Sequence, residues 1–347
     1  MITSDHSNAW RWFSAWALLG MLIALPAWSA EKIIYDTDMA EDVDDSGALA
    51  VLHALANHGE AEILATMVSA RNEWVGPCLD SINTYYGRPN IPIGYVRGLQ
   101  HGYPPTLASN RETPSKYAEE VGRHFPHDLQ KSSDAPEAAA LYRKILAAQP
   151  DQSVVIVSVG FLTNLKNLLD SPKDEASALS GEALVKQKVK LWVCMGGKFP
   201  NGLFDNGGSE YNVNYDTAAS VRAINDWPTP IVFSGFEIGS RVKAGQRLSQ
   251  TPQANPVRAC YQHYNGLNDR ESWDHTAVLF AVRGAKEYWT LSEPGLCLMH
   301  ARVQFGYNEW IPTSAKHHRY LIEKMPPADL GKVIEDLMLE PPTLGGR

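Results

Sequence analysis

Residues 33–47 read IIYDTDMAEDVDDSG, and this stretch decides the fold more than any other. Its first three residues are apolar and predict a buried strand, while the apolar pattern of residues 48–52 predicts a helix. Five aspartates and one glutamate lie between them. Carboxylates this close repel one another unless a cation or bound protons neutralise them. Such oxygen ligands suit a hard cation, Ca²⁺ or Mg²⁺, so we expect a metal-binding loop; a solvated acidic turn that caps the helix is the alternative.

Residues 1–30 have the pattern of a secretory signal peptide. Arg11 precedes an apolar run over residues 15–27, and residues 27–30 (AWSA) form a small-residue cleavage site. We therefore expect cleavage near Ala30 and export of the mature chain to a periplasm or to the extracellular space. An uncleaved anchor is the alternative, but the apolar run is short for a bilayer span, so we predict no stable membrane anchor.

The remaining residues, 31–347, are predicted to form a single, moderately acidic domain. The net charge of the chain is −8, and no Lys/Arg-rich run is present, which argues against binding to a nucleic acid polymer. The four cysteines lack the CxxC spacing of zinc sites. Cys194 lies inside an apolar strand pattern that is typical of a buried thiol.

Strand-like and helix-like segments alternate along most of this domain. Such alternation predicts an α/β fold, with an open, mostly parallel sheet and helices on both faces. A small antiparallel β addition is expected near the C-terminus, at residues 296–305. Strands are expected at residues 32–35, 62–69, 92–96, 153–159, 188–195 and 230–234, and helices at 46–57, 73–86, 135–148, 161–169, 216–226, 272–283 and 328–339. Residues 97–134 interrupt the alternation as an insertion, which is either a lid or binding loop or a surface excursion without a role.

Polar residues cluster after several of the predicted strands. Ligands bind beyond the carboxyl ends of the strands in open α/β sheets, so these clusters are expected to line one pocket. The clusters are the acidic loop after Tyr35, residues 158–164, residues 195–197 running on to 210–212, and residues 270–275.

Taken together and in this order, the motifs in these clusters resemble the inosine-uridine-preferring nucleoside hydrolase family over nearly the whole mature chain. The motifs are Asp36-Thr37-Asp38 with Asp44-Asp45, Gly160-Phe161-Leu162-Thr163-Asn164, Met195-Gly196-Gly197, Glu210-Tyr211-Asn212 and Trp273-Asp274. The resemblance implies a nucleoside hydrolase-like fold and an enzyme that hydrolyses the N-glycosidic bond of a ribonucleoside, or of a related N-glycoside, to ribose and free base. It also implies a small-molecule substrate and association into a homo-oligomer.

The resemblance further implies a Ca²⁺ at the bottom of the pocket. Its ligands would be three carboxylates and one backbone carbonyl, supplied by Asp38, Asp45, Asp274 and Thr163. Asp38 would also act as the general base toward the attacking water. Breaking a ribosyl C–N bond passes through an oxocarbenium-like state, and carboxylates around the sugar stabilise its positive charge.

Other residues would bind the sugar by the same resemblance. The side chains that would hydrogen-bond the ribose hydroxyls are Asp44, Glu210, Asn212, and either Asn206 or Asn201. A site of this kind is strict about its sugar, because an analogue that lacks a hydroxyl leaves buried polar groups unpaired.

The chain departs from the family pattern in three places. Five residues, 39–43, separate the two aspartate pairs, where the family has a shorter spacing with a Pro-Gly pair, so the extra turn must loop out for Asp45 to reach the metal. Trp273 stands where family members that activate a purine often have a histidine; an indole can stack on a base but cannot protonate it. The insertion supplies His124 and His127. We take His127 as the candidate catalytic acid, with a solvated loop histidine as the alternative.

Two other functions fit part of the sequence. Asp36-Thr37-Asp38 after a strand would suit a DxD-type phosphatase, although that reading leaves Glu210 and Asn212 unexplained. An exported nucleoside- or sugar-binding protein without turnover would keep the pocket and lack the acid. Detection of intact bound ligand rather than free base would distinguish such a binding protein from an enzyme.

Overall fold

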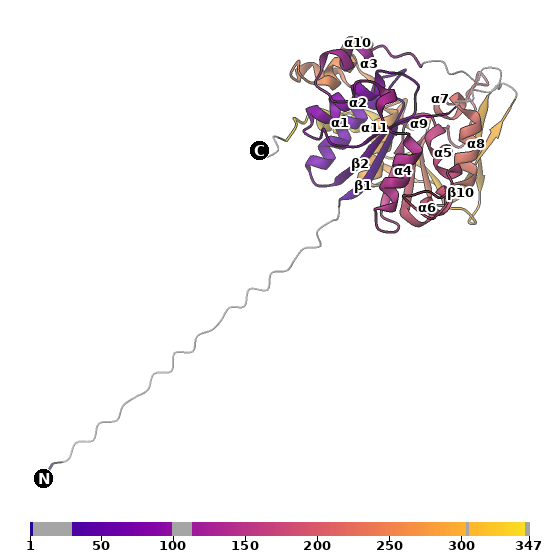
Figure 1. The fold of residues 1–347 in the computed structure, drawn as a ribbon, viewed down its shortest axis with the longest axis horizontal. Coiled ribbons are helices and arrows are strands. Elements are labelled where there is room, and N and C mark those ends of the chain that lie inside the picture. Colours follow the sequence, from indigo (N-terminus) through magenta and orange to yellow (C-terminus); the bar gives the residue numbers. More distant parts are fainter. Residues whose placement is uncertain (3–29, 99–112, 303–304, 344–347) are drawn as a thin grey trace.

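The computed structural model describes residues 1–2, 30–98, 113–302 and 305–343 (Figure 1). The signal peptide expected at residues 1–30 lies almost wholly outside the described residues, as does segment 99–112 of the insertion. None of the described helices is both long enough and apolar enough to cross a bilayer.

A ten-stranded sheet forms the centre of the fold. Its order is β11-β10-β12-β6-β5-β4-β1-β2-β3, with β9 paired to β12. The strands from β12 to β3 in this order are parallel, whereas β9, β10 and β11 pair antiparallel. The open, mostly parallel sheet and the antiparallel addition near the C-terminus are therefore confirmed. The strands are β1 Glu31–Thr37, β2 Ala61–Val68, β3 Ile93–Tyr95, β4 Val154–Ser158, β5 Val189–Met195, β6 Ile231–Ser234, β9 Trp289–Leu291, β10 Gly295–Ala301, β11 Gly306–Pro312 and β12 His318–Glu323; β7 Lys243–Ala244 and β8 Arg270–Glu271 form a separate antiparallel pair.

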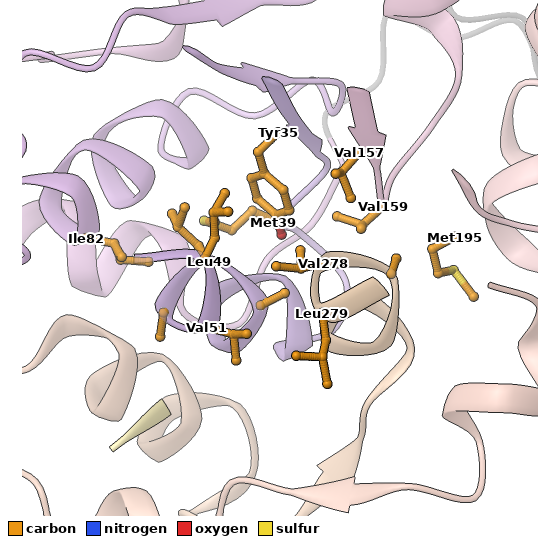
Figure 2. Packing of buried hydrophobic residues seen from close by; sticks show 14 of the residues in the cluster. Tyr35, Met39, Leu49, Val51, Ile82, Val157, Val159, Met195, Val278 and Leu279 are labelled. Carbon is orange, nitrogen blue, oxygen red and sulfur yellow. The ribbon is translucent and has the colours of Figure 1, made fainter. Parts of the chain in front are cut away.

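Helices cover both faces of the sheet, and each face has its own apolar cluster. Along β1, Ile33 and Tyr35 pack into the first cluster and Ile34 into the second, as expected for a strand buried on both sides. Helices on the first side are α1 Asp44–Asn57, α2 Val75–Tyr85, α3 Ala118–His124, α10 Pro256–Asn265, α11 Trp273–Arg283 and α12 Pro327–Met338. Those on the second are α4 Ala138–Ala147, α5 Thr163–Asp170, α6 Gly181–Lys188, α7 Tyr211–Tyr215 and α8 Thr217–Asp226. Figure 2 shows Tyr35, Leu49 and Val278 among the side chains of the first cluster.

The described part of the insertion packs against α2 rather than standing alone. Helix α3 contacts α2, and the backbone N–H groups of Asp128 and Leu129 each donate to Asp80 Oδ2 at 2.8 Å. These contacts hold residues 113–134 against the body of the domain. A lid role for the insertion stays a prediction.

The four cysteines are buried free thiols. The buried position of Cys194 agrees with the sequence pattern around it. The Sγ atoms of Cys78 and Cys260 lie 3.9 Å apart, between α2 and α10.

Candidate active site

A pocket of about 380 Å³ lies at the carboxyl ends of β1, β4, β5 and β6. Five residues named from the sequence are among those that line it, namely Asp38, Glu210, Asn212, Trp273 and Asp274. The segments after four different strands meet here because the carboxyl ends of parallel strands share one edge of the sheet. Its lining combines carboxylates, among them Asp38 and Asp274, with aromatic rings, among them Trp273 and Phe236.

The acidic loop after β1 is folded around the carboxylate of Asp45. Thr37 Oγ1 and the Met39 N–H, the latter at 3.0 Å, donate to Asp45 Oδ1. Met39 has a φ of 44°, in the left-handed region, which turns the chain sharply just after the strand. The hydroxyl of Tyr35 donates to the backbone carbonyl of Asp45 at 2.9 Å. Oδ1 of Asp45 is thus held in place, while its Oδ2 is buried and has no hydrogen-bond partner among the described residues.

Four carboxylates form a compact group beside this loop. Asp42, Asp44, Asp45 and Asp274 each offer an oxygen, and these oxygens lie within 4.8 Å of one another. The Asp274 N–H donates to Asp44 Oδ2 at 3.0 Å, whereas Asp44 Oδ1 is buried without a partner. Burial, followed by the charges of neighbouring aspartates, raises the pKa of Asp44 and Asp274, and burial together with Asp42 raises the pKa of Asp45 to about 7. An all-oxygen group with unpaired buried atoms fits a hard cation, which would offset this repulsion.

The structure places the other predicted metal ligands differently. Asp38 lines the pocket and is only 5% exposed, but it lies outside the compact group of four. Burial, then the charge of Asp45, raises the pKa of Asp38. Gly160 packs directly against it: a Cβ at Gly160 would lie 2.4 Å from the Asp38 nitrogen, so only glycine allows this approach. Thr163, three residues later, begins α5, and its hydroxyl donates to Asp216 Oδ2 at 2.7 Å.

Glu210 and Asn212 are fixed at the end of β5 by backbone contacts. Glu210 caps α7, accepting from the N–H groups of Asn212 at 2.8 Å, Val213 at 3.2 Å and Gly197 at 2.9 Å. The Asn212 amide donates to the Val159 carbonyl at 3.0 Å. Both side chains are therefore held rigidly at the pocket wall. The capping role of Glu210 was not expected from the sequence.

Neither candidate for the additional sugar contact is among the residues that line the pocket. Asn206 is exposed and accepts from the Gly208 N–H at 2.9 Å. Asn201 is also exposed and forms an isolated bridge with Glu309 of β11. A role for either residue in binding ribose stays a prediction that its position does not favour.

Glu210 is expected to make the cation-free protein less stable as the pH rises. Burial raises the pKa of Glu210 to about 7 from an ordinary value of 4.5, so between these values the folded state binds a proton that the unfolded state has released. Stability then falls with pH across this interval, by at most about 1.4 kcal/mol per pH unit for one group. Urea unfolding of wild type and Glu210→Gln at pH 5 and pH 8, with chelator, measures this. The loss between the two pH values should be smaller in the variant; equal losses would contradict the assignment.

Aromatic residues and one arginine also line the pocket, beside the carboxylate group. Trp273 Nε1 donates to the Phe236 carbonyl at 2.9 Å, and the two rings lie 5.3 Å apart. The Arg270 guanidinium lies 5.0 Å from the Trp273 ring and 5.5 Å from the Tyr264 ring. Tyr211 also lines the pocket. Of these residues only Trp273 was named as a substrate contact from the sequence. Tyr211 lies within the motif Glu210-Tyr211-Asn212 but was given no role, and Phe236 and Tyr264 carry no motif that separates them from core aromatics.

His127 lies on the described part of the insertion, after α3. Its Nδ1 contacts the Phe125 carbonyl at 2.8 Å, and it is not among the described residues that line the pocket. His124 is exposed and pairs with Glu120 at 3.1 Å. The placement of both histidines gives no support to a catalytic role, so His127 as leaving-group acid stays a prediction.

The fold and site together are those of an α/β enzyme with a carboxylate-rich pocket at the carboxyl ends of its parallel strands, lined also by Glu210, Asn212 and aromatic rings. The chain belongs to the inosine-uridine preferring nucleoside hydrolase family, whose model matches residues 33–316. This membership makes it a hydrolase that acts on N-glycosyl compounds, and the family depends on a metal.

Solved structures share the fold at low sequence identity. A plant nucleoside hydrolase is 16% identical, with a TM-score of 0.64, and the match covers 90% of this chain and 99% of that one. An inosine-uridine preferring nucleoside hydrolase from Bacillus anthracis is 17% identical, with a TM-score of 0.63 and coverage of 89% and 99%. The type III effector protein XopQ, solved with adenosine diphosphate ribose, is 14% identical, with a TM-score of 0.64 and coverage of 89% and 93%. No curated protein matches the chain.

Proposed function

We propose that this protein uses Ca²⁺ to hydrolyse the N-glycosidic bond of ribonucleosides, or of a related N-glycoside, to ribose and free base. One observation carries the proposal. Asp38, a buried carboxylate with a raised pKa, lines the same pocket as Asp42 and Asp274, two members of the carboxylate group. In that group Asp44 Oδ1 and Asp45 Oδ2 are buried and lack hydrogen-bond partners among the described residues.

The cation would be held mainly by carboxylates. Asp45 and Asp274 would be ligands because both belong to the compact group. Asp38 and the Thr163 carbonyl would be the others, because the close packing of Gly160 on Asp38 brings their two segments together. Hard oxygen donors of this kind favour Ca²⁺ over softer metals. The chemistry that a bound Ca²⁺ supplies is Lewis acidity toward the attacking water.

The protein's own residues provide the base and hold the sugar. Asp38 accepts a proton from the attacking water, and a raised pKa makes its ionised carboxylate a stronger base. Glu210 and Asn212 position the ribose hydroxyls, because their backbone contacts leave them little freedom to move. The surrounding carboxylates stabilise the oxocarbenium-like transition state.

Trp273 gives the leaving base a surface to stack on. Its indole is fixed by the hydrogen bond to the Phe236 carbonyl, so the ring is oriented before substrate arrives. Stacking positions a base but does not protonate it. Substrates whose base departs readily are therefore expected to react fastest.

The proposal is tested by chromatographic detection of free base from a panel of nucleosides, with Ca²⁺ and with chelator. Base release that requires the metal supports the proposal and ranks the substrates. Ligand that is recovered intact from a folded, Ca²⁺-bound protein would instead indicate a binding protein, and phosphate release from a generic phosphoester would indicate the phosphatase alternative.

We also propose that the protein acts after export, with cleavage near Ala30. The pattern of residues 1–30 supports this location. N-terminal sequencing of the protein recovered from the producing cells tests it, since an intact Met1 would contradict cleavage.

A further inference from the structure

Asp42 is held in the pocket by two contacts from distant parts of the chain. The Tyr117 hydroxyl, buried near the start of α3, donates to the Asp42 backbone carbonyl at 2.7 Å. Arg270 Nη2 donates to Asp42 Oδ2 at 3.2 Å. One contact fixes the main chain and the other fixes the side chain, so Asp42 is not a freely moving residue of a surface turn.

The surroundings of Asp42 point to a ligand. Its carboxylate belongs to the compact group with Asp44, Asp45 and Asp274. Within this group Asp44 Oδ1 and Asp45 Oδ2 are buried and have no hydrogen-bond partner among the described residues, and Asp44 and Asp45 are each 1% exposed. Unpaired buried carboxylate oxygens are costly unless a cation or a proton reaches them.

Asp42 also contributes strongly to the repulsion within the group. Its carboxylate is the fourth negative group in the cluster, with an oxygen within 4.8 Å of those of Asp44, Asp45 and Asp274. A cation placed among these oxygens would remove that repulsion, and Asp42 would then stabilise the bound state instead of opposing its neighbours.

Arg270 offsets part of the charge that Asp42 adds. Its guanidinium is held between the rings of Trp273 and Tyr264, and its Nη1 donates to Glu271 at 2.8 Å. These contacts keep one positive charge beside the outer edge of the carboxylate group. A single arginine leaves the four carboxylates with an excess of negative charge, which a divalent cation can offset.

We propose that Asp42 is a direct ligand of the cation, supplied by the lengthened loop between Asp38 and Asp44, and that Arg270 balances its charge. The proposal rests on the metal dependence in the proposed function. It goes beyond the ligands expected from family resemblance, which are Asp38, Asp45, Asp274 and the Thr163 carbonyl. It predicts a site with more carboxylate ligands and correspondingly higher affinity for Ca²⁺.

Calorimetric titration of the chelator-treated, full-length protein with Ca²⁺ tests the proposal without a substrate. Asp42→Asn should weaken Ca²⁺ binding by about ten-fold or more, because one ligand charge is lost. Asp205→Asn is the control, since Asp205 is exposed and lies outside both the pocket lining and the compact group; it should change affinity by less than about three-fold, as expected for a screened surface charge. Tb³⁺ luminescence excited through the pocket aromatics gives a second reading of the same site.

Arg270→Gln separates a ligand role from a purely structural one. If Asp42 binds the cation, this variant should keep Ca²⁺ affinity or raise it, because a positive charge beside the cation is removed. Equal losses in Arg270→Gln and Asp42→Asn would show that Asp42 acts only as the partner of Arg270, and wild-type affinity in Asp42→Asn would also overturn the proposal. Absence of Ca²⁺ binding by the wild type would instead overturn the calcium dependence on which the proposal rests.

Discussion

Replacing Asp38 with asparagine is expected to lower kcat by roughly a thousand-fold, within the range that loss of a general base produces. The side chain keeps its size but can no longer accept a proton from the attacking water. The measurement is base release by wild type and Asp38→Asn at saturating Ca²⁺ and substrate, so that any weakening of metal or substrate binding does not lower the observed rate. Turnover within about ten-fold of wild type would exclude Asp38 as the base.

The same substitution should not destabilise the cation-free protein. Asp38 is buried beside Asp45, and its pKa is raised by this burial and by that charge, so removing the carboxylate relieves repulsion in the folded state. The thermal midpoint of Asp38→Asn with chelator is expected to equal or exceed that of wild type. A large fall in the midpoint of Asp38→Asn would mean that its loss of activity reflects unfolding.

The control for the kcat measurement is Asp205→Asn, because Asp205 lies on an exposed loop outside the pocket lining.

Removal of the cation is expected to abolish turnover and to lower the thermal midpoint by roughly 5 °C at neutral pH. A ligand present at 100 times its Kd stabilises the folded state by about 2.7 kcal/mol, and a chain of this size responds by about 2 °C per kcal/mol. Differential scanning fluorimetry with Ca²⁺ and with chelator measures the shift, at matched ionic strength. An identical midpoint in both conditions at pH 8 would contradict a bound cation.

The shift should depend on pH in a defined direction. Burial and the charge of Asp42 raise the pKa of Asp45 to about 7, so at pH 5 protons already neutralise this carboxylate in the folded protein and compete with the cation. Protonation of Asp45 stabilises the cation-free folded protein at low pH, and this stabilisation is lost as the pH rises through about 7. The Ca²⁺-dependent gain in midpoint should therefore be small at pH 5 and large at pH 8. Mg²⁺ at the same concentration is the control, and it should give a smaller gain because it dehydrates reluctantly and needs a stricter geometry.

Periodicity predicted the elements around the site well, because it depends on neighbours along the chain. The apolar run before Asp36 forms β1, and the helix expected from residue 46 is α1, which begins slightly earlier at Asp44. The early start places Asp44 and Asp45 in the first helical turn. The antiparallel addition was expected at residues 296–305, whereas β12, which joins it to the parallel sheet, was not expected, because its position depends on pairing with β6 and β10.

The acidic residues show where a linear pattern stops being informative. Asp36 lies within β1 on the face of Ile34, where the Tyr142 hydroxyl donates to it at 2.8 Å and the Asn164 amide at 3.1 Å, whereas Asp38 lies beyond the end of the strand at Thr37. Asp36 is therefore separated from the pocket, although the sequence shows it only two positions from Asp38. Asp42 shows the opposite case: it belongs to the carboxylate group, although the family pattern predicted no role for it.

The sequence by itself determined the parallel α/β fold, the edge of the sheet at which a pocket forms and most of the polar residues that line it, because strand and helix periods and strand-end positions are local properties. Only the tertiary structure decided which carboxylates share one site. Hydrogen bonds from Tyr117 and Arg270, which lie 75 and 228 residues away along the chain, hold Asp42 in position. His127 lies outside the pocket lining, and its neighbours Asp128 and Leu129 donate hydrogen bonds to Asp80 of α2. Contacts over such separations depend on how whole elements pack, which local patterns do not encode.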